Sequence, residues 1–283
     1  MNAFSFSKEN RNFVQNSRMK NIPIDECHNI LITMASAFDE ICRRHQIPYY
    51  MIGGTMLGAV RHQGFIPWDD DMDFAVERTY FPKLLKALSE ELPSHLKVRT
   101  LDNSDAIFSN FFKIEDTRTE VIEQWHDHTT GMGITIDIFP LDNGRKNYFQ
   151  TKLLAMYVFF LLILKDYVYF DPKFRRGFKK VLAIILRKTN PIPLKKRLKY
   201  IDNLIVKYTK NESGYLINYY GRWRQKEIIP KTVFGTPQTY QFENLALTGV
   251  ENADAYLSAL YGNYMQLPPK EKRINHMNEM RYK

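Results

Sequence analysis

The residues of this sequence best suited to chemistry are four aspartates in two short segments. Asp69, Asp71 and Asp73 stand at alternate positions of DDDMD, and Asp137 stands in the apolar run GITIDIFPL. Because side chains alternate across an extended strand, Asp71 and Asp73 are predicted to point the same way. Asp69 joins them if the extended conformation reaches back that far, whereas Asp70 is predicted to point elsewhere.

Carboxylates on one face repel one another and resist joint ionisation unless a cation lies between them. Oxygen ligands at this spacing suit Mg²⁺ or Mn²⁺, which keep bound waters and bridge substrate phosphates. Asp137 adds an acid on an apolar strand, where a lone carboxylate is costly unless it is paired or bound to a metal. The alternative is that DDDMD is a solvated turn entering a strand, because aspartate-rich turns are common.

A glycine pair, Gly53 and Gly54, lies between the apolar run PYYMI and a helical pattern. Glycine lets the backbone approach a ligand closely, and the N–H groups that open a helix can hold phosphate oxygens. Thr55 fits as the N-cap of this helix or as a hydroxyl donor to the same phosphate. Glycine also serves steric purposes at many strand-to-helix turns, so the pair alone is a weak signal. The order of strand, glycine pair, helix, loop and acids places the acids at a sheet edge beside this turn.

The elements around these residues indicate an α+β fold. The chain has 283 residues, of which 44% are hydrophobic, enough for a substantial core. An amphipathic helix is expected over residues 24–46, with Asp25 as its N-cap. A mixed sheet with helices packed on it is the architecture that the alternating patterns favour. Strands are expected within residues 48–52, 72–76, 95–101, 107–116, 118–125, 133–141 and 239–250, and helices within 55–61, 80–90 and 253–265.

The pattern changes over residues 148–210 to long apolar helices rich in Lys and Arg, broken at Pro172, Pro191 and Pro193. These helices indicate an insertion or subdomain. We therefore divide the chain into a catalytic core at 1–147, a basic, apolar helical subdomain at 148–226, and a C-terminal part at 227–283 that packs back on the core.

The positive charge of the chain is concentrated in one segment. Residues 171–210 hold thirteen Lys or Arg and two Asp, a balance of +11, so with +9 on the whole chain the remainder carries −2. An apolar run at 153–164, too short to span a bilayer, precedes this segment. Together they predict peripheral contact with an anionic membrane. A helical lid over the active site with solvated lysines fits equally well, and nucleic acid is a weaker third candidate.

The cysteines and the first residues bear on location. Cys27 and Cys42 are too few for a disulfide framework and fall in one predicted helix, which indicates reduced thiols. The start MNAFSFSKENRNF carries charges and lacks the apolar core of a secretory signal. A cytoplasmic location is expected, with peripheral contact at the inner face of the cell membrane.

The block GGTMLGAVRHQGFIPWDDDMD, followed by IDIFPLD, resembles the LicD family of phosphotransferases, which is related to fukutin and the fukutin-related protein in the nucleotidyltransferase-fold superfamily. The similarity runs from about residue 49 to residue 142. The segment YLSALYGNYMQLPP and the following His276 resemble the C-terminal part of the family. The resemblance implies a nucleotidyltransferase-like mixed β-sheet core with packed helices and a helical insertion.

The resemblance also implies an activity. Family members of known activity move a phospho-alcohol group, usually phosphocholine from CDP-choline, onto a sugar hydroxyl of a glycan. We therefore expect transfer onto a cell-surface glycan, such as lipopolysaccharide or teichoic acid, or onto its lipid-linked precursor, with release of CMP. Transfer of glycerol or ribitol phosphate, or of a nucleotidyl group, stays open. A nucleic-acid-binding module is the non-enzymatic alternative, although such a module has no use for three converging carboxylates.

By the same resemblance, the acids receive roles. Asp71 and Asp73 correspond to the metal-binding pair and Asp137 to the third acid on a neighbouring strand, so these three are the expected catalytic residues. Asp69 is the expected additional ligand of Mg²⁺ or Mn²⁺. Asp137 either positions a metal or accepts the proton of the attacking hydroxyl.

Three basic side chains are candidates for contact with the donor diphosphate: Arg61, His62 and Lys113. Their structural alternatives are a surface arginine, a hydrogen-bonded structural histidine and a solvated strand lysine. Trp68 either shapes the pocket, stacking on a base or choline headgroup, or packs in the core. His126 and His128 form an H-x-H pair that we interpret as a polar loop rather than a metal site.

Overall fold

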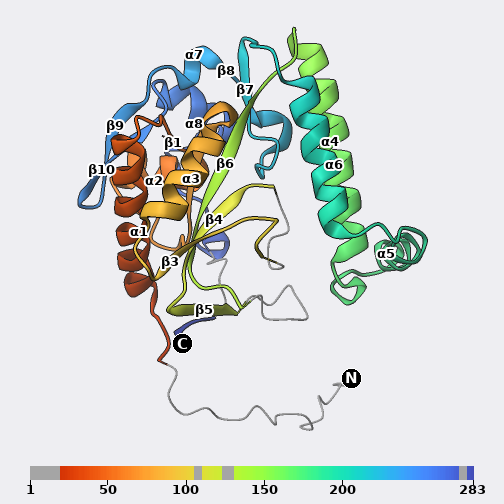
Figure 1. The fold of residues 1–283 in the computed structure, drawn as a ribbon, viewed down its shortest axis with the longest axis horizontal. Coiled ribbons are helices and arrows are strands. Elements are labelled where there is room, and N and C mark those ends of the chain that lie inside the picture. The colour runs from red at the N-terminus through yellow and green to blue at the C-terminus, as the bar shows by residue number, and fades with distance from the viewer. Residues whose placement is uncertain (1–19, 105–109, 123–130, 274–278) are drawn as a thin grey trace.

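A mixed sheet forms the frame of the fold (Figure 1). The computed structural model describes residues 20–104, 110–122, 131–273 and 279–283. In these residues the main sheet has the strand order β3-β4-β6-β2-β1-β10-β9, with β7 and β8 attached to β6. The strands are β1 (Tyr50–Met51), β2 (Met72–Glu77), β3 (Leu96–Arg99), β4 (Phe112–Asp116), β6 (Thr135–Asn143), β7 (Tyr215–Ile217), β8 (Ile228–Pro230), β9 (Gln238–Phe242) and β10 (Leu245–Gly249).

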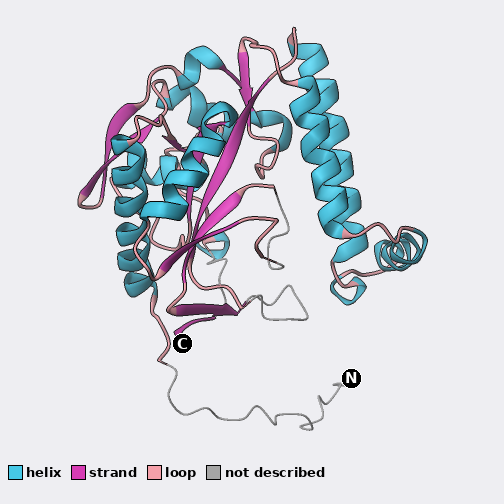
Figure 2. Ribbon diagram, viewed as in Figure 1, coloured by secondary structure: helices cyan, strands magenta, loops and turns pink. Residues whose placement is uncertain are grey.

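Parallel and antiparallel pairs occur in the same sheet. Strand β2 runs parallel to β6, and β1 runs parallel to β10, whereas β1–β2, β3–β4, β4–β6 and β9–β10 are antiparallel. Helices pack beside this sheet rather than alternating with every strand (Figure 2). The predicted α+β class with a mixed sheet is therefore confirmed.

A second sheet, separate from the main one, has two strands. It pairs β5 (Thr119–Ile122) with β11 (Glu279–Tyr282). The sequence patterns predicted only a polar segment at the end of the chain. The short strand escaped them because an exposed edge of four residues shows little hydrophobic alternation.

The helices of the core are α1 (Ile24–Arg44), α2 (Gly53–His62), α3 (Phe81–Glu91), α7 (Lys231–Phe234) and α8 (Ala253–Tyr261). The apolar face of α1 is buried at three- and four-residue spacing, through Cys27, Leu31, Met34 and Phe38. The prediction of Asp25 as N-cap is wrong. The helix begins at Ile24 with Pro23 in the capping position, so Asp25 already lies in the first turn, where its charge still favours the helix dipole.

The main core lies between α1 and the central strands. Phe38, Tyr49 and Phe74 form an aromatic group with ring centroids 4.9 to 5.7 Å apart, and each pair is in tilted or edge-on contact. In β2, Met72, Phe74 and Val76 are fully buried. The strand that carries the acidic segment is therefore held rigidly by packing on its apolar side.

The predicted helices of residues 148–210 are present as α4 (Tyr148–Tyr169), α5 (Phe178–Thr189) and α6 (Leu194–Tyr208). The breaks between them contain the three prolines. In Figure 1, α4 and α6 run side by side next to β7, and α5 lies at their far end. A second core joins α4 and α6 to β7 and β8, through Ala155, Val158, Ile201, Ile205, Ile217 and Ile228. The division of the chain at residues 147 and 226 stays a prediction.

Candidate active site

The glycine turn and the acidic strand are tied together by hydrogen bonds. The N–H of Ile52 donates to the carbonyl of Asp73 at 3.1 Å, and the N–H of Asp73 donates to Oγ1 of Thr55 at 2.8 Å. Both backbone polar groups of Asp73 are therefore fixed by the turn that starts α2. The prediction of Thr55 as N-cap is wrong, because the helix begins at Gly53 with Ile52 in the capping position. The buried Thr55 hydroxyl positions Asp73 instead.

The glycine pair makes room for carboxylates. Gly53 has a φ of +54°, in the left-handed region that favours glycine, and a Cβ there would lie 3.3 Å from Oδ2 of Asp73. A Cβ on Gly54 would lie only 2.6 Å from Oδ2 of Asp69. The bare backbone predicted for ligand approach thus also brings two acids against the start of α2.

Asp73 and Asp137 lie next to each other on the same face of the sheet. They are direct partners in the parallel pairing of β2 with β6. Burial raises the pKa of Asp73 well above its usual value, and the charges of Asp71, Asp137 and Asp69 raise it further, while Lys113 lowers it. The structure therefore brings together the four acids that the sequence singled out.

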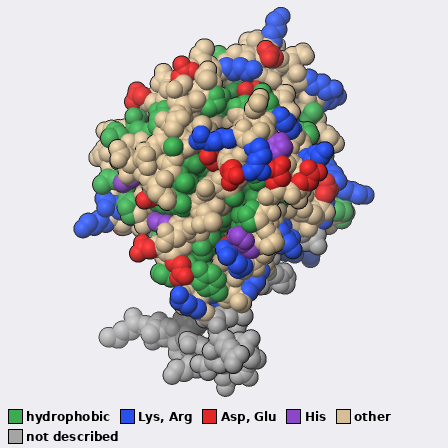
Figure 3. Space-filling model, turned by 60° about the vertical axis from the view of Figure 1, so that its left-hand side comes forward, with side chains coloured by type: hydrophobic (Ala, Val, Ile, Leu, Met, Phe, Trp, Pro, Cys, Tyr) green, Lys and Arg blue, Asp and Glu red, His purple; other side chains and the backbone are tan. Residues whose placement is uncertain are grey.

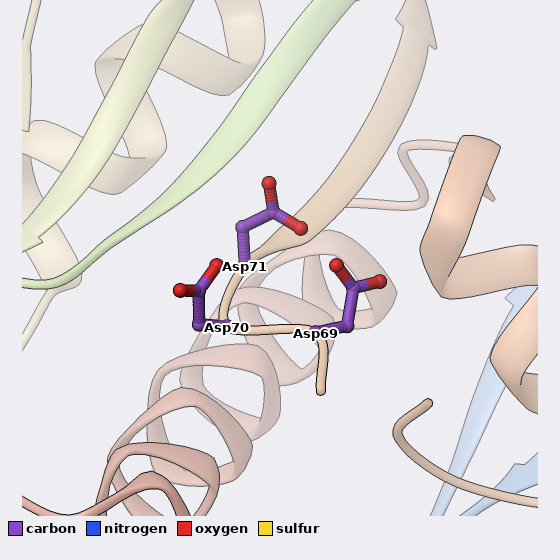
Figure 4. Close-up of side chains that lie close together, drawn as sticks. All are labelled: Asp69, Asp70 and Asp71. Carbon is purple, nitrogen blue, oxygen red and sulfur yellow. The ribbon is translucent and has the colours of Figure 1, made fainter. Parts of the chain in front are cut away.

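The three consecutive aspartates also lie close together (Figure 4). One carboxylate oxygen from each of Asp69, Asp70 and Asp71 lies within 4.8 Å of the others. Asp70 is buried, and its carbonyl lies 3.9 Å from Sγ of Cys27. The prediction that Asp70 points elsewhere is therefore wrong in part, because β2 begins only at Met72 and residues 69–71 do not follow strand alternation.

Lys113 is paired with Asp137. Its Nζ lies 2.6 Å from each carboxylate oxygen of Asp137, and Oγ1 of Thr135 lies 3.3 Å from Oδ1. Lys113 and Asp137 are partners in the antiparallel pairing of β4 with β6. This ion pair explains how an acid is tolerated on an apolar strand. Contact of Lys113 with a donor diphosphate stays a prediction.

The acid cluster has the chemistry of a divalent-cation site. Asp69, Asp71, Asp73 and Asp137 carry four negative charges when ionised, and the Lys113 ammonium offsets one of them. The four carboxylates offer hard oxygen ligands. The Cys27 thiol lies beside Asp70, and burial, followed by the charges of Asp70 and Asp71, raises its pKa to about 12. Oxygen ligands without a thiolate fit Mg²⁺ or Mn²⁺ rather than a soft metal. Binding of either cation stays a prediction.

Gly54→Ala is expected to weaken cation binding. The added methyl group would force the Asp69 carboxylate away from the start of α2, because its Oδ2 lies 2.6 Å from the Cβ position. Moving one supporting group typically weakens metal affinity roughly 10- to 100-fold. Titration calorimetry with Mn²⁺ measures the change. Gly214→Ala is the matched control, because its Cβ meets no atom within 4 Å, and an unchanged affinity in Gly54→Ala would contradict the assignment.

Comparison with known proteins identifies the domain that carries the acid cluster. Residues 46–158 match the model of the LicD/FKTN/FKRP nucleotidyltransferase domain. Residues 46–158 are therefore a LicD-family domain. The lipopolysaccharide cholinephosphotransferase LicD of Haemophilus influenzae is 27% identical over 270 residues, covering 91% of this chain and 97% of that protein. An uncharacterized protein of Rickettsia typhi is 43% identical over 49 residues, which cover 16% of this chain and 16% of that protein. An uncharacterized protein of Rickettsia prowazekii is 51% identical over 37 residues, which cover 13% of this chain and 14% of that protein.

The basic residues of the LicD block are anchored to the C-terminal part of the chain. One guanidinium nitrogen of Arg61 donates to the carbonyl of Tyr264 at 2.7 Å, and its Nε donates to Nε2 of His62 at 3.0 Å. Burial lowers the pKa of His62, and the charge of Arg61 lowers it further, so His62 is a neutral acceptor in this pair. Arg273 lies over the Trp68 ring, 5.1 Å from its centroid. Phosphate contacts by Arg61 and His62 stay predictions.

Two tyrosines of α8 lie near the acid cluster, although no sequence pattern predicted them there. The hydroxyl of Tyr256 accepts the N–H of Gly53 at 3.1 Å, so α8 holds the glycine turn directly. Burial raises the pKa of both Tyr256 and Tyr261, and the charge of Asp73 contributes to each shift. Both residues fall in the segment YLSALYGNYM. Their spacing is typical of a core helix and gave no signal of its own.

A buried carboxylate, Glu227, lies behind these tyrosines and also raises their pKa. The N–H of Trp223 donates to its Oε1 at 3.2 Å. A Cβ on Gly221 would lie 2.3 Å from the same oxygen, so that glycine makes room for the carboxylate. Burial raises the pKa of Glu227 to about 7, against the smaller opposite effect of the Trp223 N–H.

Glu227→Gln is expected to remove a pH-dependent loss of stability. Because the folded-state pKa of about 7 lies above the ordinary value of 4.5, the folded protein binds this proton more tightly than the unfolded chain. The free energy of unfolding therefore falls as pH rises from about 4.5 through 7, by about 3 kcal/mol in total. The glutamine keeps an oxygen for the Trp223 N–H, so the variant should exceed the wild type by roughly 2 to 3 kcal/mol at pH 8 and by far less at pH 4.5.

Denaturant unfolding at the two pH values measures this difference. Glu40→Gln is the control, because Glu40 lies on the exposed surface of α1 and should give no such pH dependence. An equal advantage of Glu227→Gln at both pH values would show that Glu227 stays ionised in the folded protein.

Three histidines singled out in the sequence, His126, His128 and His276, lie outside the described residues.

Proposed function

We propose that this protein is a divalent-cation-dependent transferase that moves phosphocholine from CDP-choline onto a sugar hydroxyl of a lipopolysaccharide or similar cell-surface glycan, releasing CMP. The observation that carries the proposal is the cluster of four acids against the start of α2 in a LicD domain. Similarity to a lipopolysaccharide cholinephosphotransferase over most of the chain supports the donor and acceptor classes. A cytoplasmic reaction, as the sequence predicts, is part of the proposal.

The acids and the start of α2 have separate roles in the proposed reaction. Asp69, Asp71 and Asp73 hold Mg²⁺ or Mn²⁺, which when bound supplies charge compensation for the diphosphate and the departing CMP. The N–H groups that open α2, beside Gly54 and Thr55, hold phosphate oxygens, because the first turn of a helix leaves them without intrahelical acceptors.

In this proposal Asp137 acts as the general base, the second of the two roles that the family resemblance implies for it. The sugar hydroxyl oxygen forms a bond to the phosphorus of the phosphocholine group, the bond from that phosphorus to the oxygen of CMP breaks, and the hydroxyl proton passes to Asp137. The Lys113 ammonium, 2.6 Å from both carboxylate oxygens, fixes the orientation of this base. Alignment and charge compensation provide most of the acceleration in such a transfer.

The test is a donor panel with purified protein. CDP-choline, CDP-glycerol and CDP-ribitol are each incubated with lipopolysaccharide and Mg²⁺ or Mn²⁺, and CMP release and labelling of the glycan are both measured. We expect cation-dependent release from CDP-choline, with choline and not cytidine appearing in the glycan. Cytidine in the glycan would instead indicate nucleotidyl transfer. Absence of release with every donor, together with tight binding of an oligonucleotide, would replace the proposal with a nucleic-acid-binding module.

A further inference from the structure

Helix α4 exposes an apolar face. Its exposed large side chains recur at three- and four-residue spacing, so they form a stripe along one side of the helix. Phe149 is 68% exposed and Phe160 is 59% exposed. The opposite side of α4, through Ala155 and Val158, is already buried against α6 and the strands beyond it. The stripe comprises Phe149, Leu153, Met156, Phe160 and Ile163.

Helix α5 adds a second exposed apolar face, bordered by basic side chains. Phe178 is 77% exposed, and Val181, Ile184 and Ile185 are also exposed, while Ala183 is buried. Around them lie the exposed basic residues Arg176, Lys179, Lys180, Arg187 and Lys188. The stripe of α4 and this face of α5, with its basic border, are called the docking surface below.

We propose that the docking surface binds an anionic lipid bilayer peripherally. An amphipathic helix with Phe and Ile on one face and Lys and Arg beside it is the pattern that inserts at the headgroup boundary. The balance of +11 over residues 171–210 complements the negative charge of such a bilayer, whereas a lid packed on the active site would cover the apolar side chains. Among the described helices, none combines the length and apolarity needed to span a bilayer.

The face of the molecule that carries α1 and β9 has a different character. The side that carries α1 and β9, brought forward in Figure 3, shows acidic and basic side chains intermixed. An anionic bilayer would therefore orient the molecule by the docking surface. Binding of the docking surface to a bilayer does not depend on the proposed transfer reaction.

Vesicle flotation tests the proposal with the full-length protein. Vesicles of phosphatidylcholine alone are compared with vesicles that also contain phosphatidylglycerol, at low and high salt. We expect flotation only with phosphatidylglycerol and weaker flotation at high salt. Lys179→Ser combined with Lys180→Ser should lower the partition coefficient about 30-fold, because each basic side chain near an anionic surface contributes about a factor of five. Phe160→Ser combined with Phe178→Ser should lower it at least about tenfold.

Matched controls separate the docking surface from the rest of the protein. Met265→Ser combined with Leu267→Ser removes two exposed apolar side chains elsewhere, and Lys86→Ser combined with Lys97→Ser removes two exposed charges elsewhere. Both control variants should float as the wild type does. Equal flotation on both vesicle types, or none on either, would overturn the proposal. A wild-type dimer in sedimentation that dissociates in the Phe160 and Phe178 variant, without flotation, would assign the surface to a second copy of the chain.

Discussion

Asp73→Asn is expected to lower phosphocholine transfer by roughly 10³-fold, because a cation held by one fewer carboxylate loses several kcal/mol of transition-state charge stabilisation. Asparagine keeps the size of the side chain, and both backbone hydrogen bonds of residue 73, to Ile52 and Thr55, remain available. Turnover is measured as CMP release from CDP-choline at saturating Mn²⁺. Asp102→Asn is the control, because that carboxylate is 74% exposed beyond the end of β3.

The same substitution is expected to raise the thermal midpoint of the cation-free protein. Burial and three neighbouring acids raise the pKa of Asp73, so its ionised form destabilises the fold, and a neutral amide relieves that repulsion. A residue that only supports the fold would show the opposite, a lower midpoint together with lower activity. Retention of turnover within a few-fold of the wild type would end the assignment of Asp73 as a cation ligand.

The acid cluster shows how far the sequence determines a site. Strand alternation predicted that Asp73 would share a face with Asp71. The apolar context of Asp137 predicted that this acid needs a partner. The sequence could not supply the pairing of β2 with β6, which places Asp73 and Asp137 side by side across 64 positions of chain. Nor could it show that Lys113 on β4 is that partner, since strand order depends on packing between distant segments.

The errors arise where local geometry departs from the regular pattern. The start of α2 was predicted two residues late, since Gly53 and Gly54 were taken for a turn, and so Thr55 was mistaken for its cap. Likewise Asp70 approaches its neighbours because it precedes the strand. The tyrosines of α8 have the hydrophobic spacing of an ordinary packed helix, so only three-dimensional contact with Gly53 shows their place at the site.

Arg78→Met is expected to destabilise the protein by about 3 to 5 kcal/mol, because it leaves a buried carboxylate without its cation. Arg78 follows β2 and binds Asp142 of β6 through two nitrogens, at 2.5 and 2.8 Å. A third nitrogen lies 3.0 Å from Asp202 of α6, so one guanidinium connects the core sheet to the helical segment. Although burial lowers the pKa of Arg78, the two carboxylates raise it more, which keeps the side chain charged.

Chemical denaturation of the wild type, Arg78→Met, Asp142→Asn and the double variant measures the coupling between Arg78 and Asp142. The double variant should recover part of the loss, because the neutral amide no longer needs the guanidinium. Arg44→Met provides the exposed comparison, since Arg44 pairs with Glu40 and Glu91 on the surface, where water screens both charges, and should change stability little. If Arg78→Met unfolds at the same denaturant concentration as Arg44→Met, water must reach Asp142, and the link between sheet and helices must rest on apolar packing alone.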